Sequence, residues 1–417
     1  MKPFRRIAFR AQPDWRVEIS AEFQDGRKIR QSLPVSPPES CRVEEEEHRN
    51  VPLFRENKFL SGSRLRALIA DECTVSGCLL PDTLRVFGEP GREFRPGVDY
   101  YADPVWGAWG RLADGGIRPR DRVRVSYSYV PLRIDSIVFD GEFRIRHGAL
   151  NGATPLPPSL NAGETALCNL FFDRPRRYFS REQLFPLQEP FTPPPVGAAA
   201  EKLPRTLRKL RNGEPCRILA WGDSVTRCDY IHPTGERWPN QVAAGLKRRF
   251  PRSRIRLVNL GWPGKGTSSF LNEPPDSRYH YESKVLGSGA DLVILEFVND
   301  AWLTCRKEFD RIYRRIVADM RERGMELLVV VPHPVRPDWM GMQTQNRIAG
   351  DPRPYVKYLR ELIDEFDLPA ADVSGRFLHL WKEGIPYNTL MRNNINHPDL
   401  RGMALYAQTV LNLFPED

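Results

Sequence analysis

The stretch Cys216-Arg-Ile-Leu-Ala-Trp-Gly-Asp-Ser-Val-Thr226 decides the fold of the second half of the chain. Its apolar run, Ile218 to Trp221, has the length of a short buried strand, and Gly222-Asp223-Ser224 follows directly. Open α/β sheets bind ligands at the carboxyl ends of their strands, so this order predicts a serine hydroxyl at a binding crevice. Gly, Asp and Ser are also ordinary turn residues, so the triplet indicates a site only together with later stretches that supply partners for a nucleophilic serine.

Strands and helices alternate after this stretch. Continuous apolar runs, typical of strands buried on both faces of a parallel sheet, follow at residues 255–260, 292–297 and 327–331. Amphipathic helical spacing separates them, at residues 238–250, 308–323 and 354–366. The alternation predicts an α/β three-layer sandwich, in which helices flank a parallel sheet.

The chain up to about residue 185 has a different pattern. Residues 122–129 alternate polar and apolar side chains, which predicts a strand with one buried face. Asp140-Gly141 lies between two apolar runs and favours a tight hairpin. Short strands separated by turn residues, with almost no helical periodicity, predict an N-terminal β-sandwich that is jelly-roll-like.

A proline-rich segment separates the two patterns. Residues 191–200 contain Thr-Pro-Pro-Pro, which is typical of a semi-rigid spacer, and a basic amphipathic helix is predicted over residues 202–211. We therefore expect three parts. They are a β-sandwich accessory domain over 1–185, a linker with the basic helix over 186–212, and an α/β domain over 213–417.

Composition excludes several classes of protein. With 41% hydrophobic and 28% charged residues, the chain resembles an ordinary globular protein. Its net charge of +9 is spread along the chain without a nucleic-acid-binding motif, so we expect no nucleic-acid partner. No apolar run approaches the length of a membrane span, and we expect no membrane insertion. The sequence as it stands lacks a secretory signal, which predicts a cytoplasmic protein, secreted only if a leader is missing.

Seven cysteines occur at irregular spacing. This pattern predicts neither a disulfide framework nor a pair of metal knuckles. No two histidines have the spacing of a zinc-binding helix, so no metal site is expected.

Further polar groups follow the other predicted strands. Gly264 lies in a glycine-rich loop after the second apolar run, where the backbone can approach a ligand. Asn299 follows the third run, and His397 comes shortly before the last predicted helix, 403–413. A hydroxyl, a backbone N–H, a side-chain amide and an imidazole are thus expected at one edge of the sheet.

These four blocks, over roughly residues 215 to 414, resemble the SGNH hydrolases, also called the GDSL esterase/lipase superfamily. The resemblance implies that Ser224 is the nucleophile and His397 its general base. It also implies an oxyanion hole made of the Ser224 and Gly264 N–H groups and the Asn299 amide. Asp223 precedes the serine and Asp300 follows the asparagine. Both are expected to hold these groups in place without contacting the substrate. The chemistry of the family requires no metal or organic cofactor.

Two positions depart from the family pattern. Phe297 replaces the glycine that usually begins the third block, and Asn394 replaces the aspartate that usually precedes the histidine by three residues. Asparagine cannot stabilise an imidazolium as a carboxylate does, and the equivalent change in a triad protease costs roughly ten-thousandfold in rate. Three outcomes are open: a Ser-His dyad oriented by Asn394 or a backbone carbonyl, an acid from elsewhere, or a weakened enzyme. We favour the dyad, because the chain resembles carbohydrate esterases that join a jelly roll to an SGNH domain and work as dyads.

The expected function is therefore carboxylester hydrolysis that removes acetyl groups from a carbohydrate, with a small-molecule or polysaccharide ester as substrate. Trp262, Trp302 and His333 lie near the expected site in sequence and are candidate substrate contacts. One alternative is a lipase or thioesterase of the same superfamily. Another is a glycan-binding protein whose SGNH domain is weakened or inactive. Its sugar platform would be an aromatic cluster, although packing is the more common role of aromatics. The cluster comprises Tyr100, Tyr101, Trp106 and Trp109.

Overall fold

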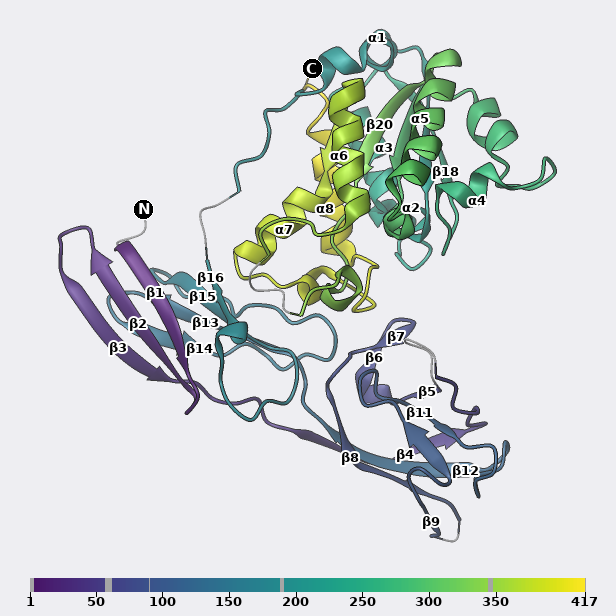
Figure 1. The fold of residues 1–417 in the computed structure, drawn as a ribbon. Coiled ribbons are helices and arrows are strands. Elements are labelled where there is room, and N and C mark those ends of the chain that lie inside the picture. The colour runs from purple at the N-terminus through teal and green to yellow at the C-terminus, as the bar shows by residue number, and fades with distance from the viewer. Residues whose placement is uncertain (1–3, 57–61, 90, 188–190, 344–347, 417) are drawn as a thin grey trace. The chain divides into compact units, whose positions relative to one another are not determined.

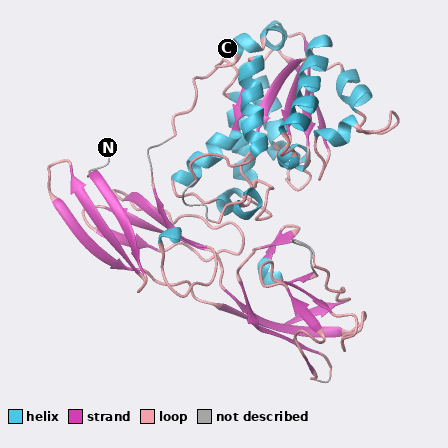
Figure 2. Ribbon diagram, in the orientation of Figure 1, coloured by secondary structure: helices cyan, strands magenta, loops and turns pink. Residues whose placement is uncertain are grey.

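The computed structural model describes residues 4–416 except 57–61, 90, 188–190 and 344–347. The chain divides into two compact units. Unit 1 comprises Met1–Glu189, Thr344–Arg347 and Trp381–Ile395, and unit 2 comprises the rest. Strands dominate unit 1, whereas unit 2 has a sheet surrounded by helices (Figure 2). Positions 188–190 of the predicted linker lie outside the described residues.

Two antiparallel sheets form a β-sandwich in unit 1 (Figure 1). The first has the order β1-β2-β3 and the second β14-β13-β15-β16. Their bounds are Phe4–Gln12, Arg16–Phe23 and Lys28–Pro34 for β1 to β3, and Arg133–Phe139, Phe143–Arg146, Thr165–Phe172 and Leu184–Pro186 for β13 to β16. Buried side chains of both sheets, including Ile19 and Ile137, share one apolar cluster. The predicted hairpin at Asp140-Gly141 joins β13 to β14. An N-terminal β-sandwich is therefore confirmed.

A second apolar core lies in the same unit. Around it are β4 (Cys41–Arg49), β5 (Ser63–Arg64), β8 (Leu79–Phe87), β9 (Glu93–Phe94), β10 (Tyr100–Ala102), β11 (Ala108–Arg111) and β12 (Arg122–Tyr129), with the short pair β6 (Ile69–Ala70) and β7 (Cys73–Thr74). Tyr100 and Trp109 are buried in this core, so packing explains both rings, whereas the side chain of Tyr101 is 45% exposed.

Unit 2 contains a five-stranded parallel sheet of order β18-β17-β19-β20-β21. The strands are β17 (Pro215–Gly222), β18 (Arg254–Gly261), β19 (Leu292–Glu296), β20 (Glu326–Val331) and β21 (Ala370–Asp372). The helices of this half of the chain are α1 (Pro204–Asn212), α2 (Ser224–Arg227), α3 (Trp238–Arg249), α4 (Thr267–Leu271), α5 (Arg306–Glu322), α6 (Pro354–Phe366), α7 (Val373–Lys382) and α8 (Leu400–Leu411).

Helices cover both faces of this sheet. Leu219 and Val293 share a core with α5 and α6 on one face. Successive residues of a strand point to opposite faces, so Ile218 and Ala220 face the other way, toward the layer in which α3 packs against α8. The predicted α/β three-layer sandwich is confirmed.

The strand order reverses its direction at β17. Numbered by their order in the chain, the strands lie in the sheet as 2-1-3-4-5. The chain therefore moves from β17 to one edge of the sheet, and from β19 onward toward the opposite edge. Ligands in such sheets bind at this switch point, outside the carboxyl ends of the strands. Gly222 at the end of β17 pairs with Glu296 at the end of β19. The turns that follow these two strands therefore start side by side.

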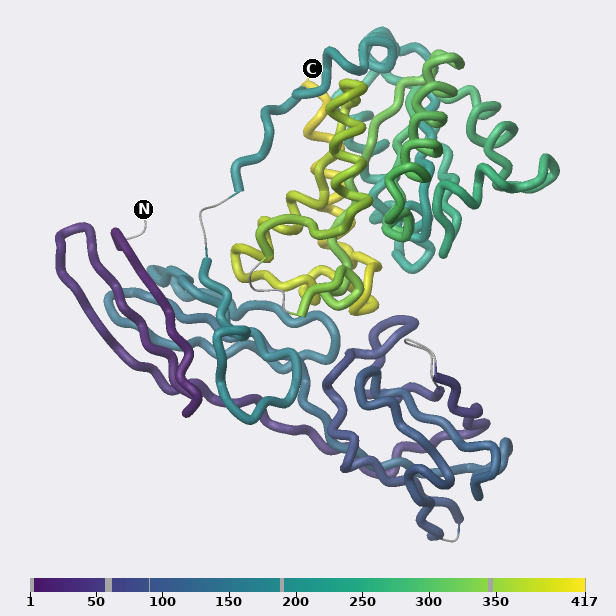
Figure 3. Tube along the Cα trace, in the orientation of Figure 1, coloured from purple at the N-terminus to yellow at the C-terminus, as the bar shows by residue number. Residues whose placement is uncertain are grey.

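The carboxyl end of the chain packs on the segment that precedes α1 (Figure 3). Gly197 donates its backbone N–H to the Asn412 carbonyl at 2.9 Å, and the Asn412 amide donates to the Pro194 carbonyl at 2.7 Å. These bonds fix the far end of α8. Among the described residues, no helix combines the length and the apolar character needed to cross a bilayer.

Candidate active site

Ser224 is the first residue of α2, and one residue, Asp223, separates it from the end of β17. Asp223 caps this short helix: its Oδ1 accepts the Val225 N–H at 2.9 Å. Its Oδ2 accepts the Asn299 N–H at 2.8 Å. A single carboxylate thus joins the serine turn to the turn that follows β19.

The turn after β19 carries Asn299 and Asp300. The Asn299 side-chain amide lies 3.4 Å from the Lys265 carbonyl, which it faces as a donor. Asp300 is buried, and its carboxylate accepts both the N–H of Thr267 at 2.9 Å and its hydroxyl at 2.7 Å. Tyr313 donates a third hydrogen bond, at 2.7 Å. Asp300 therefore ties this turn to the glycine-rich loop after β18.

Two glycines in that loop are required by its conformation. Gly264 has φ +73°, in the left-handed region that side chains other than glycine rarely adopt. A Cβ at Gly266 would lie 2.1 Å from Oδ1 of Asp300. The loop can thus pass close to the buried carboxylate only because glycine stands at position 266.

His397 lies beside Ser224. Its Nε2 is 3.0 Å from Ser224 Oγ. The imidazole ring also stacks on the ring of Tyr230, with centroids 4.3 Å apart and planes inclined by 8°. The segment before it is held by His333, whose Nε2 lies 3.0 Å from the Asn396 carbonyl oxygen.

Asn394 belongs to unit 1, although it lies only three residues before His397. Its side-chain oxygen accepts a hydrogen bond from Asn388 Nδ2 at 2.7 Å. Its Nδ2 donates to the Ala153 carbonyl at 2.9 Å. Both polar groups of this side chain are therefore engaged within unit 1.

Part of the chain is similar to a known family. Residues 220–405 match the GDSL-like Lipase/Acylhydrolase family. The match covers less than half of the 417-residue chain, and this part, which is similar to the family, is called the GDSL-type domain below. The match lies within the region, residues 215 to 414, for which the sequence motifs predict an SGNH hydrolase, and the predicted enzyme class is confirmed.

Several solved structures resemble this GDSL-type domain. An alpha/beta hydrolase from the metagenome of Lake Arreo, Spain, is 20% identical, with 48% of this chain and 94% of that chain covered and a TM-score of 0.38. An acetylxylan esterase from Geobacillus stearothermophilus is 18% identical (48% and 93% covered, TM-score 0.39). A two-domain esterase active on acetylated mannans is 19% identical (52% and 53% covered, TM-score 0.40). No curated protein matches the chain.

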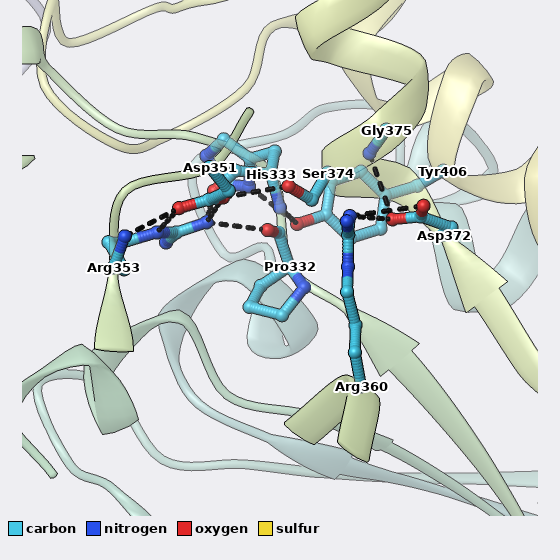
Figure 4. Close-up of polar contacts among 9 residues, drawn as sticks. All are labelled: Pro332, His333, Asp351, Arg353, Arg360, Asp372, Ser374, Gly375 and Tyr406. Carbon is cyan, nitrogen blue, oxygen red and sulfur yellow. Dashed lines mark hydrogen bonds and ion pairs between the residues drawn. The ribbon is translucent and has the colours of Figure 1, made fainter. Parts of the chain in front are cut away.

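Arg353 and Asp351 form a buried ion pair near His333 in the GDSL-type domain (Figure 4). Arg353 bonds the Asp351 carboxylate at 2.6 Å and also donates to the carbonyls of Pro332 and His333 at 2.8 and 2.9 Å. The Ser374 hydroxyl donates to the same carboxylate. The His333 ring is fully buried, and its Nδ1 lies against the Tyr406 hydroxyl. His333, which the sequence suggests as a substrate contact, is enclosed here and holds the chain that leads to His397.

Burial shifts the pKa values of several groups around the site. It raises the pKa of Asp223 to about 7, against the opposing effect of the N–H groups that bond it. It raises the pKa of Asp300 to about 6, and that of Glu296 well above its ordinary value. Burial and the nearby charge of Arg353 lower the pKa of His333 to about 3. Clusters of shifted pKa values are common at active sites.

The two tryptophans near Gly264 and Asn299 in sequence differ in exposure. Trp262 is half-buried and stacks on Tyr279, with centroids 4.2 Å apart. Trp302, three residues after Asn299, is 72% exposed. Tyr230 is the residue that the sequence motifs miss: its pairing with His397 is made by the fold, and no local pattern around it indicates a role.

Proposed function

We propose that the GDSL-type domain hydrolyses carboxylic esters through a Ser224–His397 dyad and that its substrates are acetyl esters of a carbohydrate. The observation that supports the dyad is the 3.0 Å separation of Ser224 Oγ and His397 Nε2, at the carboxyl end of β17. This separation is within the hydrogen-bonding range of a nucleophile and its base.

The reaction proceeds by acylation and deacylation. His397 Nε2 takes the hydroxyl proton as Ser224 Oγ attacks the ester carbonyl. The tetrahedral intermediate carries negative charge on the former carbonyl oxygen, which the N–H groups of Ser224 and Gly264 and the Asn299 amide stabilise. The imidazolium then donates its proton to the leaving alcohol. Water then attacks the acyl-enzyme with His397 again as base. The imidazolium returns this proton to Ser224 Oγ as the bond between Oγ and the acyl carbon breaks, and the carboxylic acid leaves.

The supporting groups fit this proposal. Asp223 and Asp300 bond the turns that carry Ser224, Asn299 and the Gly264 loop, so they hold the donors in register without contacting the substrate. Fixed donors act without reorganisation during the reaction, which is the basis of oxyanion stabilisation. Asn394 bonds Asn388 and Ala153, and the dyad as proposed assigns it no part in orienting His397.

The carbohydrate part of the proposal rests on Trp302. An exposed indole three residues from Asn299 offers a large apolar face with a polar N–H, the surface on which a sugar ring can stack. A lipase or thioesterase would use the same dyad on a different alcohol or thiol.

The first experiment compares wild-type protein and Ser224→Ala in the hydrolysis of aryl acetates, with a fluorophosphonate probe applied to both. We expect turnover and labelling by the wild type, and a loss of at least about a thousandfold in Ser224→Ala, since a nucleophile has no substitute. Ser268→Ala, on α4, is the matched control and should keep full activity. A wild-type protein that is folded but neither turns over nor is labelled would refute the esterase mechanism.

Substrate class is decided by a second comparison. Acetylated oligosaccharides, long-chain aryl esters and acyl thioesters are supplied to the same protein, and we expect the highest kcat/KM for the oligosaccharides. Trp302→Ala should raise KM for the oligosaccharide and leave that for aryl acetate nearly unchanged. A higher kcat/KM for the long-chain aryl esters would indicate a lipase in place of a carbohydrate esterase.

A glycan-binding function is the second candidate, and a pocket in unit 1 favours it. The pocket has a volume of about 830 Å³, and Phe54, Tyr101, Asp103 and Val105 are among its lining residues. Phe54 and Tyr101 pack edge to face, with centroids 4.7 Å apart. Glycan affinity that Tyr101→Ala abolishes, in a protein without ester turnover, would support binding in place of hydrolysis.

A further inference from the structure

The ring stack between Tyr230 and His397 has a geometry that points to a role. Its centroid separation is 4.3 Å and its interplanar angle is 8°, so the imidazole lies nearly parallel to the phenol ring. Tyr230 follows α2 and the left-handed residue Cys228, so the turn that begins at the serine also delivers this ring. The same short segment therefore supplies two neighbours of the imidazole, a hydroxyl at its edge and a ring at its face.

An aromatic face attracts positive charge. The faces of aromatic rings carry partial negative charge, and cations over them are stabilised, most strongly where water is excluded. His397 becomes positive each time it takes the proton of Ser224 or of water. The phenol ring is thus placed against the group whose charge appears only during the reaction, when stabilisation increases the rate.

The hydroxyl of Tyr230 takes no part in this interaction. It is buried, and among the described residues no hydrogen-bond partner is found for it. Burial raises the pKa of Tyr230 well above its ordinary value, so the phenol stays neutral. A proton relay through this hydroxyl is therefore disfavoured, and the ring itself is the functional part.

We propose that Tyr230 is a positioning residue for His397, whose ring fixes the plane of the imidazole and stabilises the imidazolium formed during ester hydrolysis. The inference rests on the proposed function, because it assigns His397 the role of base. It accounts for how the imidazole is held while the side chain of Asn394 bonds Asn388 and Ala153.

The test compares Tyr230→Phe, which keeps the ring, with Tyr230→Leu, which removes it, in the full-length protein. The free energy of a cation–π contact corresponds to a rate effect between about twofold and about thirtyfold. We expect Tyr230→Leu to lower kcat for aryl acetate by about tenfold with KM nearly unchanged, and Tyr230→Phe to stay within about twofold of wild type. Tyr230→Met serves as a second ring-free variant if Tyr230→Leu does not fold.

Proton NMR provides a readout that does not depend on turnover. The imidazole C–H resonances of His397 are assigned as those that are present in the wild-type spectrum and absent from the spectrum of His397→Gln. We expect them to be shifted upfield by the facing ring in the wild type and in Tyr230→Phe, and to lose that shift in Tyr230→Leu.

Wild-type kcat in the ring-free variants, or an equal loss in Tyr230→Phe, would overturn the role of the ring. Unchanged His397 resonances in Tyr230→Leu would overturn the stack itself. Turnover that Ser224→Ala abolishes would keep the esterase function in either case, so failure of this inference and failure of the proposed function are distinguishable.

Discussion

Gly266→Ala is the most direct test of how the glycine-rich loop after β18, which carries Gly264, is held. The added Cβ would lie 2.1 Å from Asp300 Oδ1, whereas such atoms normally stay more than about 3 Å apart in packed interiors. The loop or the carboxylate must therefore move by about 1 Å. The same Oδ1 accepts the Thr267 N–H at 2.9 Å, so either movement breaks or stretches that bond.

The expected size of the effect follows from these contacts. Overpacking a buried site costs about 1 to 3 kcal/mol. A lost hydrogen bond to an acidic group costs about 1.5 to 3 kcal/mol, so we expect the free energy of unfolding to fall by about 3 kcal/mol in total. A displacement of about 1 Å at the reacting groups costs about a hundredfold in rate, and we expect a loss of that order in kcat.

Urea unfolding and aryl acetate hydrolysis measure the two effects, and a double-mutant cycle with Asp300→Ala tests their cause. Asp300→Ala removes the carboxylate and with it the clash. The loss of unfolding free energy in the double variant should therefore be smaller than the sum of the two single losses, by at least about 1 kcal/mol. Additive effects, or a Gly266→Ala protein with wild-type stability and kcat, would refute the argument.

Two further predictions concern Asn394 and His333. Asn394→Asp restores the family residue, but its second oxygen would face the Ala153 carbonyl. We therefore expect a loss of about 3 kcal/mol in unfolding free energy and no gain in kcat. A tenfold gain in kcat would contradict this. The pKa of His333 is lowered to about 3, so this group contributes stability that is present above about pH 6.5 and is lost as the pH falls toward 3. Between pH 7 and pH 4.5 the wild type should lose about 2.5 kcal/mol more than His333→Gln in urea unfolding. Equal losses would exclude His333 as the cause.

The strands of unit 2 and the positions of Ser224 and Asn299 could be predicted because continuous apolar runs mark buried strands, and the end of a strand marks the sheet edge. The pairing of Ser224 with His397 needed the family motifs, since 173 positions separate the two residues. The side-chain partners could not be predicted. Periodicity shows which face of an element is buried, but it does not show that Tyr230 meets His397 or that Asn394 meets Ala153.

The segment Trp381–Ile395 limits how this enzyme can be divided. Although it lies within the GDSL-type sequence, it folds in unit 1, where Asn169 donates to the Gly384 carbonyl at 2.6 Å and Ile395 packs with Cys73 and Trp106. A fragment starting at residue 213 would expose these apolar side chains to water just ahead of His397. The C-terminal half of the chain is therefore not expected to fold correctly by itself. Exchanging it between related proteins would require compatible residues in unit 1, where Trp381–Ile395 packs.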